Sequence, residues 1–554
     1  MHRLMLLFGL MILALSFAIT LAIAAGSGLA ATPHNGIETF SKVTVSNAGS
    51  YTLSAAGLNL TSATSSSFAI SAPSVTINGS TVLQNTPISI VAAPGGTFAI
   101  TYNWRAAPVA GQYSVFVDFI DSTGTVQFQD NQQPPVSPSQ WSGTLSYTHT
   151  VTVPASVAIG TYKIVAGLQL SSGYLSMTPG PGVTAFGNGY QTGTLTIAPT
   201  CSITSFGAVG DGKKDNRTAI QNTFNYATTH HCIAFIPAGS FAYSGNITAT
   251  GIAVQGTGAA SILMPLSLTN QALTVQGSGG SVYNLAMVST ATTRLSTPWS
   301  GMIWVDNAQN YYVENVLING SSSIGIESYM SHGGFILNNT VENTLADSIT
   351  QIAASYDITV SGNRVVNSGD DGISNNSYIG EPGAVHDITV QGNTVLHNRW
   401  GRGLEVSGGN NITFTGNYVD NTDGYADMYA GSESQWKTQS TSNVTFSGNT
   451  LVDSGPNQGS ALVYNSEPAG YAVTNITISG NQFVNPKLTP FQVTGTGSVS
   501  GVVVENNTDY STGQFTNSSN PNATFTLTGN RILAPSAYTA PLVPAGGGCN
   551  FSGC

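Results

Sequence analysis

The stretch DITVSGN (357–363) returns along the C-terminal part of the chain as DITVQGN (387–393), NITFTGN (411–417), NVTFSGN (443–449) and NITISGN (475–481). Each copy alternates β-branched or aromatic residues with small polar ones, which is typical of a short strand that ends in a turn. Looser copies end at Asn315, Asn339 and Asn530, and the intervals from Asn315 to Asn481 are 24, 24, 30, 24, 32 and 32 residues. This period predicts a right-handed parallel β-helix, in which each coil stacks on the one before it.

The asparagine that closes each copy has a structural explanation. Stacked Asn side chains form hydrogen bonds along the axis of repeated strands, so an Asn ladder accounts for the repetition without a functional role. Many of these residues also lie in Asn-x-Ser/Thr triplets, which we attribute to the Asn- and Thr-rich composition rather than to glycosylation.

The composition limits the partners of the protein. Charged residues make up 7% of the chain, against about 25% in an average protein. Apolar residues make up 41% and recur in short strand-like runs, which excludes general disorder. With a net charge of −11 and only 14 Lys and Arg, the chain lacks the basic surface that nucleic acids need and repels polyanions. We therefore expect a monomer that binds a polysaccharide, a neutral glycan rather than a densely anionic one, and no nucleic acid.

The N-terminal third is predicted to contain a leader and β modules. A short basic start followed by an apolar run predicts a secretory signal over residues 1–31, and hence a secreted or cell-surface protein; an uncleaved run would act as an anchor. Residues 32–73 look like part of an immunoglobulin-like fold, and residues 74–199 predict a β-sandwich accessory domain. Trp104 and Trp141 are its candidate exposed aromatic residues, and the module is either a spacer or a carbohydrate-binding domain.

The β-helix itself is predicted over residues 200–545. It begins with FGAVGDGKKDNRTAIQNTF (206–224), in which a strand and a glycine-rich turn lead into an amphipathic helix capped near Asp215 or Asn216. The segment resembles the first element of pectate-lyase-superfamily β-helices, where such a helix covers the open N-terminal end.

Four cysteines allow three pairings, and their proximity in the sequence favours two local disulfides. Cys201 pairs with Cys232 in this prediction, and Cys549 pairs with Cys554 in a tail over residues 546–554. Export permits disulfides, and neither pair has the flanking His or Cys residues of a zinc site.

Candidate chemistry is concentrated in three consecutive coils. ADSIT carries Asp347, GDDGIS carries Asp370 and Asp371, and GRGLEV carries Arg402. Asp347 and Asp371 are 24 residues apart, so they should lie one above the other at about the 4.8 Å spacing of neighbouring strands. Arg402 begins the next coil, after the inserted segment SNNSYIGEPGAVH.

Carboxyl groups this close together differ in pKa and can therefore take different roles in catalysis. Mutual repulsion raises the pKa of one group and leaves another ionised, which is what a general acid and a general base require. A single Asp at a β-helix bend more often caps a turn, but an Asp pair above a third Asp, beside an Arg, favours a catalytic site.

The NTLAD (343–347) and NSGDDGIS (367–374) segments, followed by a Gly-x-Gly-Leu coil start, resemble the catalytic coils of inverting β-helix glycoside hydrolases. The nearest patterns are the family 28 polygalacturonases and the family 87 α-1,3-glucanases, and the resemblance covers about residues 201–481. It implies that Asp347, Asp370 and Asp371 are the catalytic acid and base residues.

Three departures from these patterns bear on the substrate. The Gly-His-Gly of polygalacturonases is Gly401-Arg402-Gly403 here, and the strand that should carry their uronate-binding Arg-x-Lys reads ADMYAG (426–431). The DGI coil of the glucanases reads DSI. The missing uronate-binding pair argues against galacturonate.

Substrate-binding candidates flank the carboxylates in the sequence. Arg402 is expected to bind the sugar or adjust the carboxylates, Glu405 and Asp427 to extend a groove, and Trp400 to stack on a sugar ring. His386 is the last of the candidate substrate-binding residues.

Two other classes of function stay open. A polysaccharide lyase or epimerase acting on a uronic-acid polymer would need a basic residue and calcium, for which Asp370, Asp371 and Glu405 offer oxygen ligands. A non-catalytic surface protein would bind sugar without turnover. For the hydrolase we expect no cofactor and no metal.

Overall fold

The computed structural model describes residues 88–539 apart from gaps at 107–110, 112, 142, 172, 176, 180–183, 297–299 and 468–469, and before residue 88 only short strands from β1 (Ile19–Ile23) to β8 (Ser80–Leu83). The chain forms two compact units, one of residues 1–90, 99–151 and 160–196 and one of residues 91–98, 152–159 and 197–554. The predicted signal, most of residues 32–73, and the tail with Cys549 and Cys554 lie outside the described residues. Within the described ranges, no helix has the length and apolar character needed to cross a membrane.

The N-terminal unit is built from paired β-strands, as the sequence predicts. Its larger sheet has the strand order β12-β11-β14-β18-β17, with β9 beside β18 and β15 beside β14, while β10 pairs with β13. The strands of this region are β9 (Ile88–Ala92), β10 (Thr97–Ala106), β11 (Ser114–Ile120), β12 (Val126–Gln129), β13 (Gly143–Thr152), β14 (Gly160–Leu170), β15 (Gly173–Tyr174), β16 (Met177–Pro179), β17 (Ala185–Phe186) and β18 (Gly189–Ile197).

Trp141 is a core residue of this unit, and the expectation that it is exposed is wrong. Only 2% of its surface is accessible, and its Nε1–H donates to Val136 O at 2.8 Å. An indole that buries its faces and satisfies its one donor stabilises the fold, and it offers no stacking platform to a sugar.

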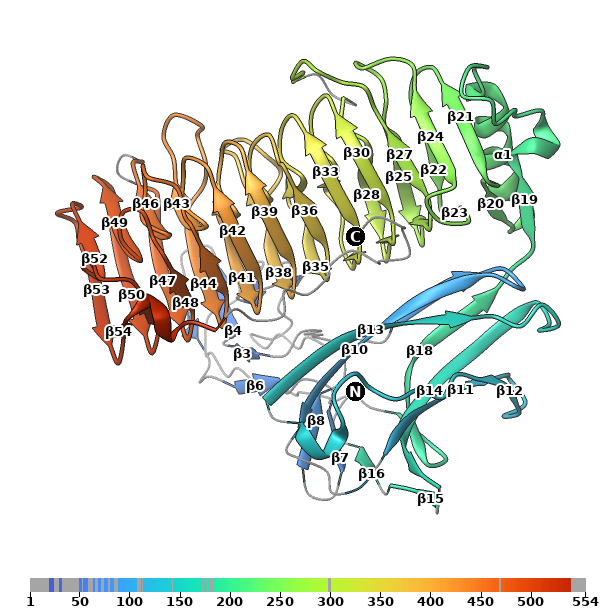
Figure 1. The fold of residues 1–554 in the computed structure, drawn as a ribbon, viewed down its shortest axis with the longest axis horizontal. Helices are drawn as coiled ribbons and strands as arrows, with labels where there is room; N and C mark the ends of the chain where they lie inside the picture. Colours follow the sequence, from blue (N-terminus) through green and yellow to red (C-terminus); the bar gives the residue numbers. More distant parts are fainter. Residues whose placement is uncertain are drawn as a thin grey trace, which may run out of the picture. The chain divides into compact units, whose positions relative to one another are not determined.

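The second unit is a parallel β-helix of three sheets, and each coil adds one strand to each sheet in turn (Figure 1). Sheet 1 contains β19 (Thr200–Ser202), β20 (Ile233–Phe235), β23 (Ala253–Gln255), β26 (Ser281–Tyr283), β29 (Tyr312–Glu314), β32 (Phe335–Leu337), β35 (Tyr356–Ser361), β38 (His386–Gln391), β41 (Gly409–Thr415), β44 (Thr441–Ser447), β47 (Ala472–Ser479), β50 (Ser498–Glu505) and β53 (Ala523–Thr528). Sheet 2 contains β21 (Gly239–Tyr243), β24 (Ser261–Pro265), β27 (Ala286–Val288), β30 (Leu317–Ser321), β33 (Thr340–Thr344), β36 (Arg364–Val366), β39 (Thr394–Asn398), β42 (Tyr418–Thr422), β45 (Thr450–Val452), β48 (Gln482–Val484), β51 (Thr508–Tyr510) and β54 (Arg531–Leu533). Sheet 3 contains β22 (Ile247–Thr250), β25 (Leu273–Ser278), β28 (Ile303–Gln309), β31 (Ile326–Tyr329), β34 (Ile349–Ile352), β37 (Ile373–Asn376), β40 (Leu404–Ser407), β43 (Met428–Ser432), β46 (Ala461–Asn465), β49 (Phe491–Gly495) and β52 (Thr516–Ser518).

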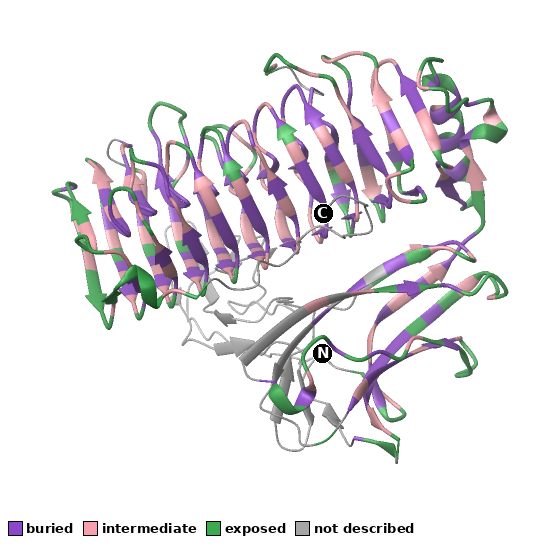
Figure 2. Cartoon of the chain, viewed as in Figure 1, coloured by how far each residue is buried: buried purple, intermediate pink, exposed green. Residues whose placement is uncertain are grey.

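The repeated motif supplies the strands of sheet 1, and its alternation fills the interior. Val360, Val390, Phe414, Phe446 and Ile478 occupy one register column, and each is at most 1% exposed. The rings of Phe414 and Phe446 stack with their centroids 4.7 Å apart. Buried strand faces therefore form a continuous core along the axis (Figure 2).

The predicted Asn ladder runs along the turn between sheets 1 and 2. Each Nδ2 donates to the Oδ1 of the next ladder residue at 2.8–3.0 Å, through Asn339, Asn363, Asn393, Asn417, Asn449, Asn481, Asn507 and Asn530. The ladder begins at Val316, whose N–H donates to Asn339 Oδ1, so the assignment of Asn315 to this position is off by one residue. Asn507 belongs to it, although its strand lacks the motif.

One helix, α1 (Arg217–His230), covers the first coil, as predicted. Asp215 Oδ1 accepts from the Arg217 N–H at 3.0 Å, so Asp215 rather than Asn216 supplies the capping hydrogen bond. Gln221 then bonds both backbone groups of Thr248 on β22, which satisfies part of an otherwise open strand edge. The predicted disulfide between Cys201 and Cys232 is present, with the two Cα atoms 5.8 Å apart.

Candidate active site

The site lies where three successive coils enter sheet 3. Asp347, Asp371 and Arg402 each stand two residues before the first residue of β34, β37 and β40, and those first residues are aligned by parallel pairing. The Ser348 N–H donates to Asp371 O at 3.0 Å, and the Gly372 N–H donates to Arg402 O at 2.8 Å. The three residues therefore occupy one column at strand spacing, as the 24-residue interval predicts.

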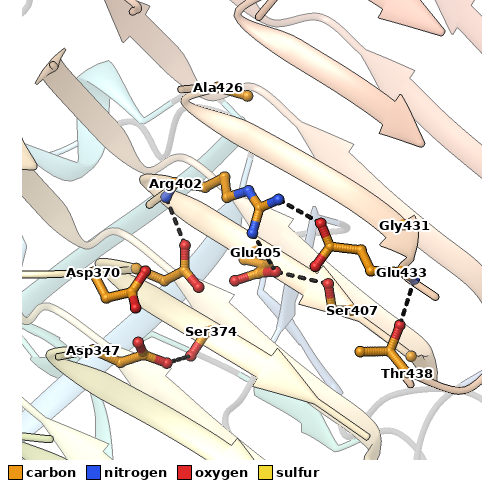
Figure 3. A network of polar contacts seen from close by, with 12 residues as sticks. Asp347, Asp370, Ser374, Arg402, Glu405, Ser407, Ala426, Gly431, Glu433 and Thr438 are labelled. Atoms are coloured by element: carbon orange, nitrogen blue, oxygen red, sulfur yellow. Dashed lines mark hydrogen bonds and ion pairs between the residues drawn. The ribbon is translucent and has the colours of Figure 1, made fainter. Parts of the chain in front are cut away.

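Three carboxyl groups lie close together at this column, and each has its own hydrogen-bond or ion-pair partner (Figure 3). One oxygen from each of Asp347, Asp370 and Asp371 lies within 4.8 Å of the other two. Ser374 Oγ donates to Asp347 Oδ2 at 2.7 Å, and the Arg402 backbone N–H donates to Asp371 Oδ1 at 2.6 Å. Asp370 alone has a side-chain cation, since Arg294 Nη2 lies 2.7 Å from its Oδ2.

These surroundings separate the proton affinities of the three groups. Burial, followed by the charge of Asp370, raises the pKa of Asp347 to about 8. Burial and the charge of Glu405 raise the pKa of Asp371 well above its usual value. Burial also raises the pKa of Asp370, but the Arg294 guanidinium opposes that rise. At neutral pH Asp347 therefore retains a proton, the pKa of Asp371 is also raised, and Asp370 is the group best able to ionise.

Arg402 is held by two glutamates and an aromatic ring. Its Nη1 lies 3.3 Å from Glu405 Oε1, its Nη2 lies 2.6 Å from Glu433 Oε1, and its guanidinium lies 4.2 Å from the Tyr429 ring centroid. Ser407 Oγ also donates to Glu405 Oε1 at 2.7 Å. Burial lowers the pKa of Arg402, but the surrounding charges, led by Glu405, outweigh burial and raise it. Arg402 is thus a fixed cation that aligns two carboxylates at the floor of the site (Figure 3).

A cleft of about 900 Å³ opens over these residues. The inserted segment after β37 forms part of its wall, because Tyr378 lines the cleft and forms an antiparallel bridge with Thr438. Trp400 and Trp436 line the same cleft with 48% and 56% of their surfaces exposed. Flat apolar rings at the rim of a polar groove suit the faces of sugar rings.

Asp427 and His386 are not in the cleft, so their assignment as substrate-binding residues is not supported. Asp427 is fully buried and accepts a hydrogen bond from Thr422 Oγ1 at 2.7 Å. His386 belongs to sheet 1, where its ring stacks 4.9 Å from that of Tyr356 and its Nδ1 lies 2.7 Å from Asp387 Oδ2. Asp427 directly precedes β43 of sheet 3, but its side chain is turned away from the cleft, whereas His386 lies on a different sheet.

Several cleft residues carry no motif and were not predicted. Arg294 comes from the loop between β27 and β28, 108 residues before Arg402 in the sequence. Glu433 directly follows β43, and Glu327 lies within β31. The signal that finds Glu327 is register, because it aligns with Thr350 and Ser374 in the column that also contains Glu405.

The comparisons with known proteins agree with this fold. The family described as "Right handed beta helix region" matches residues 293–440, and no curated protein matches the chain. The catalytic unit of a thermostable GH87 α-1,3-glucanase from Streptomyces thermodiastaticus strain HF3-3 is 18% identical, with a TM-score of 0.50 over 81% of this chain and 90% of that chain. PfbA, a surface adhesin of Streptococcus pneumoniae, is 14% identical, with a TM-score of 0.45 over 60% of this chain and 90% of that chain.

The comparison also finds a module of an enzyme from another bacterium. The A-module of the mannuronan C-5 epimerase AlgE6 of Azotobacter vinelandii is 17% identical, with a TM-score of 0.40 over 60% of this chain and 99% of that chain. Identities this low show the fold and no more. The chain is therefore a right-handed parallel β-helix protein, with a cleft lined by carboxylates on one of its three sheets.

Proposed function

We propose that the protein hydrolyses glycosidic bonds of a polysaccharide, with Asp347 as general acid and Asp370 as general base. The observation that supports this most strongly is the cluster of three carboxyl groups in one cleft, whose different partners give them different proton affinities.

The roles follow from the contacts. Asp347, with a pKa of about 8, retains a proton at neutral pH and donates it to the departing glycosidic oxygen. Asp370, whose negative charge Arg294 stabilises, takes a proton from the water that attacks the anomeric carbon. Asp371 is held by the Arg402 N–H and positions Arg402 relative to the other two carboxyl groups.

The stereochemical course is a separate part of the proposal. The resemblance in sequence implies inversion, for which carboxyl groups usually stand about 6.5–9.5 Å apart. The three groups here bring oxygens within 4.8 Å of one another, which is nearer to the spacing of retaining enzymes, about 5–5.5 Å. Proton NMR of the first-formed product decides this point: the anomer opposite to that of the substrate means inversion, and the same anomer means retention.

The lyase alternative is less well supported by the contacts. Arg402, its candidate basic residue, is paired with Glu405 and Glu433 and keeps its proton. Arg294 Nη2 lies 2.7 Å from Asp370 Oδ2, so a calcium ion would compete with a guanidinium for that oxygen, and calcium needs six to eight oxygen ligands. Three carboxyl groups, one of them already ion-paired, supply only part of the oxygen ligands that a calcium site needs.

The charges of the cleft favour a substrate without carboxylates. Uronate recognition generally needs Arg or Lys at each carboxylate, and both guanidinium groups that line the described cleft, Arg294 and Arg402, are already ion-paired. An α-glucan is the first substrate to test.

The experiment is a screen of the purified protein against neutral and acidic glycans, read by reducing ends and by ultraviolet absorbance. Release of reducing ends from a glycan without carboxylates, with no unsaturated product, is the expected result. Ultraviolet-absorbing product from polygalacturonate or alginate would replace the proposal with the lyase, and binding without any product would replace it with a non-catalytic surface protein.

A further inference from the structure

One end of the cleft contains hydrogen-bond acceptors and aromatic rings that the proposed chemistry does not use. Two neighbouring columns of sheet 3 face this end. One aligns Trp304 with Glu327, and the other aligns Asp306 with Tyr329. Glu327 lies one strand before Thr350 and two before Ser374, which holds Asp347, so this end adjoins the catalytic carboxyl groups.

The charges at this end are all negative. Burial and the negative charges of Asp306 and Glu381 raise the pKa of Glu327 to about 7, and no cation acts on it. Among the described residues, Asp306 accepts side-chain hydrogen bonds from two neutral amides, Gln276 Nε2 and Asn307 Nδ2, both at 2.7 Å. Carboxylates that repel one another without a counter-charge are costly, and a bound cation would relieve that cost.

A buried amide extends the set of acceptors. Asn376 lies in the same column as Tyr329, two strands further along, and lines the cleft. It is 5% exposed, and its Oδ1 has no hydrogen-bond partner among the described residues. A buried acceptor without a donor is costly and points to a donor on a ligand.

The overall balance of the cleft agrees with this local pattern. Seven carboxyl groups and two guanidinium groups are among its described lining residues, and both guanidinium groups already have carboxylate partners. A sugar hydroxyl can donate one hydrogen bond here but leaves the negative charge in place. An ammonium group has three donors, no acceptor and the compensating charge, and the rings of Trp304 and Tyr329 also attract cations.

We propose that this end of the cleft is a subsite for a sugar that carries a free amino group, with Glu327 and Asp306 as the carboxylates that recognise it. The substrate is then a glycan without carboxylates in which some residues are amino sugars that lack an N-acetyl group. This inference rests on the proposed hydrolase function and names the substrate class of that same cleft.

The test compares ligands that differ only at C2. Tetrasaccharides with an α-1,3-, α-1,4- or β-1,4-linked glucose backbone are each prepared with a free amine, an N-acetylamine or a hydroxyl group at that carbon. Binding to the full chain is measured by calorimetry near neutral pH, and reducing ends are measured in the same samples. For at least one backbone the free-amine form should bind about tenfold or more tightly than the other two, as expected of a desolvated charge pair.

Variants separate the subsite from general electrostatic attraction. Glu327→Gln and Asp306→Asn should each abolish the preference for the amine form while the melting temperature stays close to that of the wild type. Glu342→Gln, which removes the same charge from β33 on sheet 2 outside the cleft lining, should keep the preference. Absence of an amine preference in every backbone, or its survival in both subsite variants, overturns the proposal.

The two proposals fail in different ways. Amine-selective binding without release of reducing ends would contradict the hydrolase function and support the subsite. Turnover of the hydroxyl or N-acetyl forms without an amine preference would support the hydrolase and contradict the subsite.

Discussion

Asp347 and Asp370 belong to a cluster of three carboxyl groups, whereas an aspartate such as Asp215 only caps the start of helix α1. If they transfer protons or hold the charge of the cluster, their loss should cost far more activity than the loss of a structural aspartate. We predict that Asp347→Asn and Asp370→Asn, which remove the proposed general acid and general base, each lower kcat/KM by about 10²–10⁴-fold, the contribution of one such group. The rate is measured on a substrate found in the glycan screen, and circular dichroism checks the fold.

Asp420→Asn is the matched control. Asp420 lies on sheet 2, where it accepts a hydrogen bond from Tyr418 Oη at 3.0 Å, and it does not line the cleft. This variant should keep wild-type activity. Near-full activity of both cluster variants would show that the site has been assigned to the wrong residues.

Arg402 is the residue whose removal should destabilise the fold most within the site. Its side chain is 14% exposed and compensates the charges of Glu405 and Glu433. Arg402→Met leaves two buried carboxylates without a cation, and we expect it to lower the free energy of unfolding by about 3–5 kcal/mol. Urea denaturation measures the change.

Two further variants test the cause of that loss. Arg402→Met combined with Glu433→Gln should recover part of the stability, because one of the stranded charges is then gone. Arg364→Met, on β36, should change stability by about 0.5 kcal/mol or less. Equal effects of the two arginine variants would mean that the ion pairs at Arg402 contribute nothing.

The sequence predicted the column of Asp347, Asp371 and Arg402 because these residues stand at a fixed distance from a repeated strand. The sequence did not identify Arg294 as a site residue, because the conformation of a long loop is not set by the period of the strands it connects. It also placed Asp427 in the groove, although in register Asp427 precedes Met428 by one residue and its side chain turns toward Thr422.

At the scale of elements, the Asn ladder links successive coils through buried side-chain hydrogen bonds, in addition to the hydrogen bonds between the strands. Asn417 accepts from the backbone and side chain of Asn393 and donates to Val390 O and Asn449 Oδ1. We expect Asn417→Ala to cost at least about 3 kcal/mol, because several buried groups lose their partners and no water can replace them. Thermal and urea unfolding measure this cost.

Asn530 offers the comparison, because it ends the described ladder on a partly exposed turn. Asn530→Ala should cost about 1 kcal/mol, the usual net value of a hydrogen bond that water can replace. If the ladder does not stabilise the fold, Asn417→Ala and Asn530→Ala should lower the free energy of unfolding by equally small amounts.

The disulfide between Cys201 and Cys232 ties β19 to the start of β20 beneath helix α1. It closes a loop with a sequence separation of 31 residues. In the chain-entropy argument such a loop contributes about 3–4 kcal/mol. The Cys201→Ser/Cys232→Ser variant should lose about this much stability, and hydrogen exchange should increase first in α1 and the first coil. Free thiols at both positions in the purified, non-reduced protein would refute the pairing.

The elements of the β-helix were predictable because period and alternation agree over many coils, and the five clear motif copies all lie in strands of sheet 1 or the turns that follow them. The ladder position at Val316 was missed by one residue, because the surrounding Asn residues are abundant and no closing Gly marks the turn there. In the N-terminal unit, the alternation of apolar and polar residues predicted the strands. It did not show which face of a sheet is covered, so the burial of Trp141 could not be inferred.

For the molecule as a whole, the buried carboxyl groups determine how stability depends on pH. The pKa values of Asp347, Asp371 and Glu327 are raised in the folded protein, to about 8 for Asp347 and about 7 for Glu327. The folded state therefore binds more protons than the unfolded chain above about pH 4, and the free energy of unfolding falls as pH rises toward 8. Below that range Asp215, whose pKa is lowered, contributes the opposite slope.

We predict that the protein is more stable at pH 5 than at pH 8 in urea denaturation. Asp347→Asn removes one titrating group. The free energy of unfolding should therefore fall less steeply with pH, by up to about 1.4 kcal/mol per pH unit. The Glu342→Gln variant should keep the wild-type slope. Stability that rises from pH 5 to pH 8 would show that these carboxyl groups are ionised in the folded protein.

The Asn ladder also has a consequence for how such a protein can change over generations. Ladder residues are 23 to 32 residues apart, yet every coil returns to the same hydrogen bond, so each extra stretch of chain is confined to the loops. The segments that contain Tyr378 and Thr438, which wall the cleft, are stretches of this kind. Evolution can therefore lengthen, shorten or exchange the walls without shifting the column of Asp347, Asp371 and Arg402. Duplication of a whole coil would lengthen the groove by one strand spacing and leave the chemistry in place.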